Sequence, residues 1–347
     1  MSASLVSPDV IRRLFAQAMS RMYRTEVPLY GTLVELVERI NAQVLEQDPA
    51  LAAQLQRNDE RARLDEERHG AIRVGTVQEL ATLRRLFAVM GMYPVGYYDL
   101  SVAGVPVHST AFRPLTGAAL AQNPFRVFTS LLRLELIEDE ALRAESAKIL
   151  ARRRIFTEGA LALIDQAERD GGLSQADAER FVEEALETFR WHGDATVDLP
   201  TYHALHNAHR LVADVVSFRG PHINHLTPRT LDIDAAQAAM LERGLQAKAL
   251  IEGPPRRAVP ILLRQTSFKA LEEEVAFPDA TGTLVPGSHS ARFGEIEQRG
   301  LALTAKGRAL YDQLLMQARD AGGAGSTGGD YGQRLQAVFA SFPDDHD

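Results

Sequence analysis

Apolar residues recur every three or four positions from about Pro8 to Leu55. This period places them on one face of a helix, so the first part of the chain is predicted to be helical. Ser7 followed by Pro8 predicts its start, because serine caps exposed backbone amides and proline tolerates the first helical position. Residues 59–68 are densely charged and are predicted to be solvated.

After residue 68 the pattern changes to alternating strand and helix signals. Residues 71–74 have the composition of a short strand. Thr76 followed by Glu79 forms a capping box, in which each side chain satisfies a free amide at a helix start. Strand-like sequence returns at residues 97–102 and 105–112. We predict a first strand–helix–strand–strand–strand module here.

A second segment repeats this order further along the chain. A strand-like stretch ending at Leu226 precedes Asp232, a plausible helix cap, and a helix that ends near Gly244. Three further strand candidates follow, at residues 249–252, 259–266 and 293–299. We predict a second module of the same kind, and the two together predict an α+β fold built around a mixed sheet.

Between and after the modules the pattern is helical. The chain is predicted to be one catalytic domain, residues 1–347, with a discontinuous β core at about 65–118 and 215–300. A stretch at about 122–214 is too long for a loop and is predicted to be a helical insertion. Residues 303–319 predict one more helix, and residues 320–347, which include a glycine-rich tether, predict a flexible tail.

Composition excludes several classes of function. The 38 basic and 46 acidic residues give a formal net charge of −8, which argues against a general nucleic-acid binder. The chain has 0 cysteines, which excludes disulfides, thiolate metal sites and cysteine nucleophiles. It starts without a basic segment followed by an apolar one, and no apolar run is long enough to span a membrane. A cytoplasmic protein is therefore expected, and its oligomeric state is left open.

Three distant segments carry metal-ligand residues in a shared pattern. His69, His225 and Glu295 are each followed four residues later by an arginine, namely Arg73, Arg229 and Arg299. On a strand, residues four apart point to the same face. Two neutral imidazoles and one carboxylate hold a divalent iron on one side and leave positions open for substrate and oxygen. The pattern therefore predicts a metal centre with an anionic substrate.

The spacing leaves alternatives open. Glu297 would share a strand face with Glu295, so either could be the carboxylate ligand. His222 and His225 would point to opposite faces, so only one of them can bind. His108 lies in an apolar strand and could reach the cavity or serve as a core histidine. The remaining histidines, at 192, 203, 206, 209, 289 and 346, are interpreted as solvated or supporting residues.

The motifs resemble those of known enzymes. The paired modules resemble the vicinal oxygen chelate fold, and Phe293 to Arg299 resembles the last-ligand strand of 4-hydroxyphenylpyruvate dioxygenase. Four segments together resemble the 2-oxoadipate dioxygenase/decarboxylase family, over about Val10 to Leu315: residues 69–73, 106–114, 224–229 and 264–268.

This resemblance implies His69, His225 and Glu295 as Fe(II) ligands, because Glu295 matches the family register. It implies Arg73 as the anchor of a substrate carboxylate. The implied reaction is the Fe(II)- and O2-dependent conversion of 2-oxoadipate to 2-hydroxyglutarate and CO2, a step of lysine breakdown. Second-rank candidates for the substrate pocket are Arg229, Gln265 and Thr266, and His108 is a candidate supporting residue.

Other functions stay open at this stage. The same fold hosts aromatic 2-oxo acid dioxygenases, O2-independent metal isomerases and lyases, and small-molecule binding proteins without catalysis. The expected partners are a 2-oxo dicarboxylic acid and O2, with neither nucleic acid nor membrane. Family members commonly continue past the end of this chain into a part that contributes to the pocket, so the resemblance implies a short or truncated form.

Overall fold

A computed structural model of the chain describes residues 4–321 and 328–344. It begins with helices, as predicted. The Ser7 hydroxyl accepts a hydrogen bond from the amide of Asp9 (3.3 Å), and Pro8 is the first helical residue. This confirms the predicted helix start. The first elements are α1 (Pro8–Glu26), α2 (Pro28–Gln47), α3 (Pro49–Arg57) and the short 3-10 helix η1 (Arg61–Arg63).

A five-stranded mixed sheet follows, with strand order β2-β3-β4-β1-β5. Strands β1 and β4 are parallel, while β3 is antiparallel to both β2 and β4. The Thr76–Glu79 capping box predicted for α4 is present. The elements are β1 (His69–Val74), α4 (Val77–Val89), β2 (Tyr93–Asp99), η2 (Ser101–Ala103), β3 (Val107–Arg113), α5 (Gly117–Gln122), β4 (Arg126–Leu132) and β5 (His225–Thr227).

The predicted helical insertion at about 122–214 differs from the structure near its start, where residues 126–132 form strand β4. The strand lies between β1 and β3 and supplies the third strand after the helix of the first module. Val127, Thr129 and Leu131 are buried, and the residues between them are half-buried. This alternation with a period of two is the strand signal. The prediction missed it because the run is short and helical sequence surrounds it.

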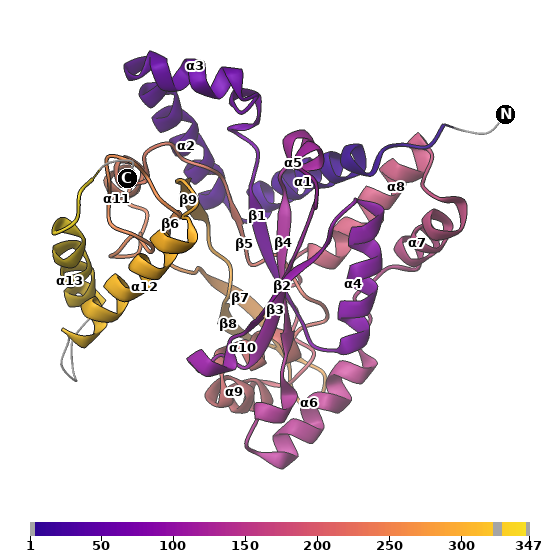
Figure 1. Cartoon of the computed structure of the whole chain (residues 1–347). Helices are drawn as coiled ribbons and strands as arrows, with labels where there is room; N and C mark the ends of the chain where they lie inside the picture. The colour runs from indigo at the N-terminus through magenta and orange to yellow at the C-terminus, as the bar shows by residue number, and fades with distance from the viewer. Residues whose placement is uncertain (1–3, 322–327, 345–347) are drawn as a thin grey trace. The chain divides into compact units, whose positions relative to one another are not determined.

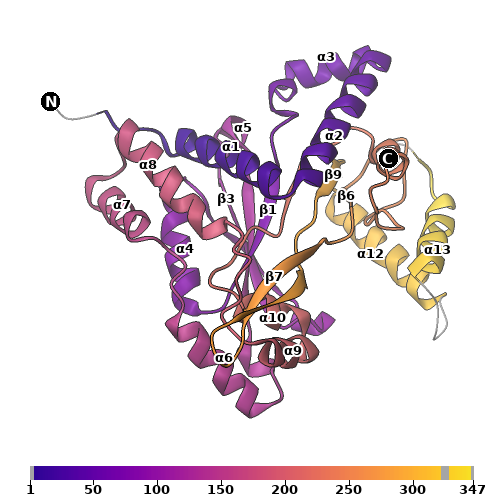
Figure 2. The same ribbon diagram turned by 180° about the vertical axis from the view of Figure 1, so that it is seen from behind.

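Helices take over after β4, as predicted for this part of the chain. They are η3 (Leu134–Leu136), α6 (Glu140–Arg152), α7 (Glu158–Asp170), α8 (Gln175–Leu186), η4 (Glu187–Phe189), α9 (Leu199–Ala208) and α10 (Arg210–Val216). Figures 1 and 2 show α4, α7 and α8 on one side of the five-stranded sheet. Helices α9 and α10 lie on the other side of the sheet, where they pack against a β-hairpin formed by residues 272–290.

The second module differs from its prediction. Helix α11 (Ile233–Glu242) is present, and the strands after it form two separate antiparallel pairs, β6–β9 and β7–β8, instead of one sheet. Residues 249–252 form no strand; Glu252 makes only an isolated bridge to Gln265. The four strands are β6 (Leu263–Ser267), β7 (Glu272–Pro278), β8 (Leu284–Ser290) and β9 (Glu295–Arg299).

The hairpin β7–β8 was not predicted. Three consecutive glutamates at its start, Glu272–Glu274, hide the strand signal, which comes from the buried Val275 and Phe277. These two side chains complete a hydrophobic core with Val212 and Val216 of α10. Whether one face of a strand is buried can therefore depend on a helix that is distant in the sequence.

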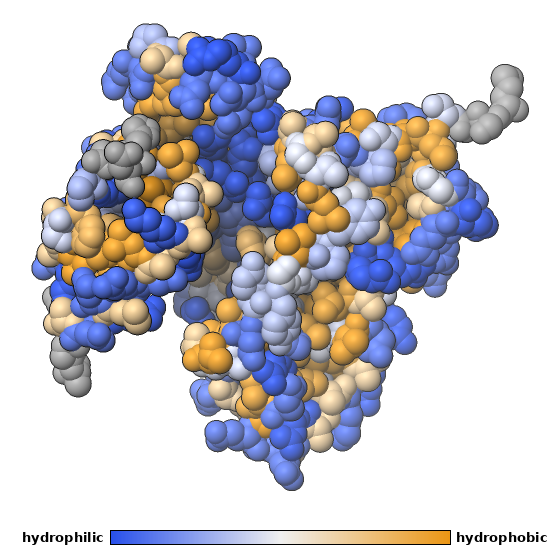
Figure 3. All heavy atoms as spheres, in the orientation of Figure 1, coloured by the Kyte–Doolittle hydropathy of each residue, from blue (hydrophilic) through white to orange (hydrophobic). Residues whose placement is uncertain are grey.

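The C-terminal part contains an element that the predicted flexible tail did not include. Helix α13 (Gly328–Ala340) packs its Leu335 and Phe339 against α12 (Ala305–Asp320), which contributes Tyr311 and Leu314 to the same core. Hydrophobic side chains are visible over these two helices in Figure 3. Most of the predicted glycine-rich tether, residues 322–327, lies outside the described residues.

Contacts group the chain into two compact units. The first contains Met1–Gly31, Glu66–Leu226 and Ala270–Phe293, and it holds the five-stranded sheet. The second contains Thr32–Asp65, Thr227–Lys269 and Gly294–Asp347. The prediction of one domain stays a prediction. Within the described part of the chain, no helix is both long and apolar enough to cross a membrane.

Candidate metal centre

Two histidines begin neighbouring strands. His69 is the first residue of β1 and His225 the first residue of β5, and their ring centroids are 5.5 Å apart with the planes perpendicular. The His69 ring meets Phe128 edge-on at 5.5 Å, and the His225 ring stacks on Phe293 at 4.7 Å. His69 is only 4% exposed. Each histidine therefore begins a strand of the same five-stranded sheet.

Tyr23 of α1 ties together the backbone beside these residues. Its hydroxyl lies 2.9 Å from the carbonyl oxygen of Asn224 and 2.8 Å from that of Phe293. The Phe293 amide also donates to the Asn224 carbonyl (3.1 Å), and the Asn224 amide donates to the Ala71 carbonyl (2.8 Å). Burial raises the pKa of Tyr23, so its hydroxyl stays protonated and donates.

Tyr23 escaped the sequence analysis. In the sequence it is one more apolar position of an amphipathic helix, and it is fully buried in the structure as such a position should be. Its hydroxyl meets segments 201 and 270 residues away. Patterns of neighbouring residues in the sequence do not indicate contacts over such separations.

The carboxylate of Glu295 is oriented by two side chains. The Thr227 hydroxyl donates to its Oε1 at 3.1 Å, and the Gln265 amide donates to the same oxygen at 2.8 Å. Hydrogen bonds of this kind fix how a carboxylate faces a metal and tune its basicity. Gln265 was predicted to line the substrate pocket, and the structure places its amide on this carboxylate instead.

One of the two candidate glutamates belongs to a group that could hold a metal ion. His69, His225 and Glu295 each offer one ligand atom, and these atoms all lie within 4.8 Å of one another. Glu297 is fully buried, and its Oε1 accepts a hydrogen bond from the guanidinium of Arg299. The set of two imidazoles and one carboxylate suits a divalent transition metal. The residues therefore fit a metal ion, and spacing alone could not choose between the glutamates.

Arg73 lies on the same face of β1 as His69, because it follows four residues later in one strand. Its Nη1 donates to Oδ2 of Asp214 in α10 at 2.6 Å. The other Asp214 oxygen lies 3.0 Å from Nε2 of His289. Burial acts to raise the pKa of Asp214, but the Arg73 guanidinium and the neighbouring His222 and His289 outweigh it and hold that pKa well below its usual range.

Two predicted pocket residues need correction. The expected same-face relation of His225 and Arg229 fails because β5 ends at Thr227, and the Arg229 guanidinium pairs with Glu60 at 2.6 Å. Thr266 lies opposite Ile296 in the β6–β9 pair, whereas Ser267 lies opposite Glu295. Successive side chains of a strand point to opposite faces, so Thr266 faces away from Glu295.

Two other histidines have different surroundings. His222 is 4% exposed, and burial lowers its pKa to about 3, so it is neutral near pH 7. Its Nε2 lies 3.0 Å from the side-chain amide of Asn224. His108 has its Nδ1 3.1 Å from the Tyr97 hydroxyl. A supporting role for His108 at the metal stays a prediction.

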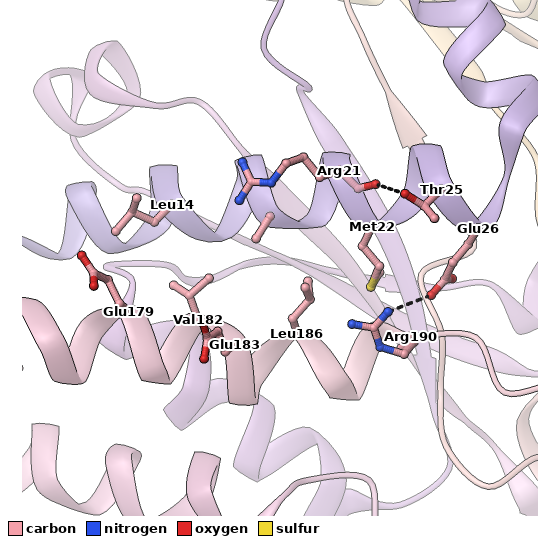
Figure 4. Close-up of a pocket in the computed structure, with 11 residues that line it drawn as sticks. Leu14, Arg21, Met22, Thr25, Glu26, Glu179, Val182, Glu183, Leu186 and Arg190 are labelled. Carbon is pink, nitrogen blue, oxygen red and sulfur yellow. Dashed lines mark hydrogen bonds and ion pairs between the residues drawn. The ribbon is translucent and has the colours of Figure 1, made fainter.

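A cavity elsewhere in the first unit lacks this chemistry. A cavity of about 470 Å³ lies between α1 and α8, with Leu14, Met22 and Leu186 among its lining residues. Figure 4 shows these three side chains between the two helices. Glu26 and Arg190 form an ion pair of 3.5 Å at one end of it. None of the predicted site residues lines this cavity, so it is not the candidate site.

Comparison with known proteins identifies the family of the chain. A family model described as 2-oxoadipate dioxygenase/decarboxylase matches residues 15–347. The chain belongs to this family. A relative of that name from Pseudomonas putida is 65% identical over 343 residues, which cover 98% of this chain and 74% of the relative. The family and enzyme class predicted from the sequence are confirmed.

Solved structures agree with the fold. A hydroxyglutarate synthase from Pseudomonas putida, in complex with 2-oxoadipate, superimposes with a TM-score of 0.93 at 64% identity, covering 98% of this chain and 76% of that one. A putative glyoxalase superfamily protein from Ralstonia eutropha JMP134 gives a TM-score of 0.57 at 22% identity, over 77% of this chain and 82% of its own. The second likeness concerns the fold alone, and it agrees with the predicted α+β class.

Proposed function

We propose that this chain converts 2-oxoadipate to 2-hydroxyglutarate and CO2 in a reaction that needs Fe(II) and O2. In this proposal His69, His225 and Glu295 hold the metal and Arg73 binds the far carboxylate of the substrate. One 2-oxoadipate and one O2 contain all the atoms of one 2-hydroxyglutarate and one CO2, so no further co-substrate is needed. The reaction would be a step of lysine breakdown in the cytoplasm.

The grouping of two imidazoles and one carboxylate, in a chain of this family, carries the proposal. A relative named 2-oxoadipate dioxygenase/decarboxylase supports the reaction, and a solved hydroxyglutarate synthase described as a complex with 2-oxoadipate supports the substrate. Bound Fe(II) would supply coordination of a 2-oxo acid and activation of O2. Thr227 and Gln265 contribute by keeping the Glu295 carboxylate in one orientation.

The rest of the substrate would be recognised by charge. A guanidinium pairs bidentately with a carboxylate and keeps its charge when partly buried. The Arg73 side chain is 22% exposed, and among the described residues only Asp214 accepts a hydrogen bond from it, through Nη1. Nε and Nη2 are therefore available to a second carboxylate. This favours a dicarboxylic over a monocarboxylic 2-oxo acid.

The test is O2 uptake by Fe(II)-loaded protein with a panel of 2-oxo acids, accompanied by product analysis. We expect uptake with 2-oxoadipate to exceed that with 2-oxohexanoate and 4-hydroxyphenylpyruvate. Glu295→Ala should lose both bound iron and turnover, while Glu297→Gln should retain iron, because Glu297 pairs with Arg299. Turnover of 2-oxoadipate without O2, or iron and activity retained in Glu295→Ala, would contradict the proposal.

A further inference from the structure

Asp214 is a buried carboxylate with partners on both oxygens. Its side chain is 4% exposed, Oδ2 accepts from Nη1 of Arg73 at 2.6 Å, and Oδ1 lies 3.0 Å from Nε2 of His289. A buried carboxylate is costly unless it is paired. Arg73 supplies that pairing, and in return Asp214 restricts where the guanidinium can lie.

His289 and Tyr202 hold Asp214 in turn. The Tyr202 hydroxyl lies 2.9 Å from Nδ1 of His289, and both side chains are buried. A carboxylate can only accept, so the Nε2 hydrogen of His289 donates to Asp214, and the Tyr202 hydroxyl is the partner of the same ring at Nδ1. Tyr202 lies on α9, Asp214 on α10 and His289 on β8, so three elements of the first unit meet at this carboxylate.

The neighbouring His222 is not a further charged partner of Asp214. His222 lies 3.6 Å from Asp214 Oδ1, too far for a hydrogen bond, and its lowered pKa of about 3 leaves it neutral near pH 7. Arg73 is bound to Asp214 through Nη1 alone. Held in this way, it presents the edge formed by Nε and Nη2, and two parallel N–H donors match a carboxylate.

We propose that Asp214 is a positioning residue, which holds Arg73 so that its Nε–Nη2 edge meets the distal carboxylate of a 2-oxo dicarboxylic acid. The inference rests on the proposed function and deepens it. It assigns to Asp214, supported by His289 and Tyr202, the preference for a dicarboxylic acid over its monocarboxylic analogue.

Binding without turnover tests the role. Dissociation constants of 2-oxoadipate and 2-oxohexanoate are measured by calorimetry on the Fe(II)-loaded protein without O2. The two acids have the same number of carbons, and 2-oxohexanoate carries a methyl group where 2-oxoadipate carries its distal carboxylate. In the wild-type protein we expect 2-oxoadipate to bind more tightly, and Arg73→Ala should abolish the difference.

Asp214→Asn keeps the shape of the side chain but removes its charge. We expect it to weaken 2-oxoadipate binding about tenfold, the low end of the loss when an orienting partner is removed, while 2-oxohexanoate binding and iron content stay unchanged. Tyr202→Phe should move the ratio in the same direction by a smaller factor, and it serves as a second variant if Asp214→Asn does not fold.

Glu79→Gln is the matched control. Glu79 is a buried carboxylate of the same unit that is paired with a buried arginine, Arg153, at 2.7 Å. The Glu79→Gln variant should have a lower free energy of unfolding than the wild type, but the same ratio of the two dissociation constants. A general loss of stability therefore cannot imitate the expected result.

The positioning role is overturned if folded Asp214→Asn leaves the ratio of the two dissociation constants unchanged, which includes equal weakening of both acids. If Asp214→Asn does not fold, an unchanged ratio in Tyr202→Phe overturns the role instead. A ratio that is also unchanged in Arg73→Ala shows that the fault lies in the Arg73 assignment of the proposed function, and the inference fails with it. A ratio lost in Arg73→Ala but kept in the Asp214 and Tyr202 variants overturns the inference alone.

Discussion

Tyr23→Phe removes the hydroxyl that joins two backbone carbonyl groups beside the candidate ligands. The Tyr23 hydroxyl is shared between the carbonyl oxygens of Asn224 and Phe293, which precede His225 by one residue and Glu295 by two. The ring itself keeps its place against Tyr30, with centroids 5.0 Å apart. The substitution therefore tests the hydrogen bond with little change in packing.

The magnitude follows from the partners that remain. The Asn224 carbonyl keeps its hydrogen bond from the Phe293 amide, whereas the Phe293 carbonyl loses its donor in the variant. Leaving one buried polar group without a partner costs about 1–3 kcal/mol. We expect the free energy of unfolding to fall by that amount in a urea titration of the metal-free protein.

Metal binding provides the second measurement. The Tyr23 hydrogen bonds fix the backbone beside two candidate ligands. We therefore expect Tyr23→Phe to lower the metal affinity measured by chelator competition about tenfold, as loss of an outer-shell partner does. Tyr30→Phe is the control, since the buried Tyr30 hydroxyl bonds instead to Glu67 at 3.2 Å. Equal metal affinities of the two variants, with both folded, would refute the reasoning.

Two further predictions concern stability. The pKa of Asp214 is lowered in the folded state, so its ionised form stabilises the protein above the unfolded-state pKa of about 3.9, and this contribution is lost as the pH falls below that value. Unfolding titrations from pH 6 to pH 3 should therefore show a smaller loss of stability for Asp214→Asn than for the wild type; equal losses would show that Asp214 does not contribute. Phe339→Ala should reduce the free energy of unfolding of the helix pair α12–α13 by about 3–5 kcal/mol, because Phe339 is 5% exposed in that core. Hydrogen exchange in α12 checks this, and unchanged protection would contradict the packing.

Local signals were the reliable part of the prediction. The Ser7 cap and the Thr76–Glu79 capping box join atoms no more than four residues apart, so the sequence contains all that they need. The predicted strands also overlap β1 and β5, although β1 begins at His69, before the predicted start at residue 71. Strand β4 and the hairpin β7–β8 were missed because long-range packing decides which of their side chains are buried.

The sequence by itself determined the donor types, the helical N-terminal part and, through its motifs, the family. Only the tertiary structure groups Glu295, and not Glu297, with His69 and His225 as possible ligands, since both glutamates lie on one face of the same strand. It also shows that Tyr23 bonds to the Asn224 and Phe293 carbonyls and that Asp214 bonds to Arg73. These bonds join residues 141 to 270 positions apart, and contacts over such separations exist only once the chain has folded.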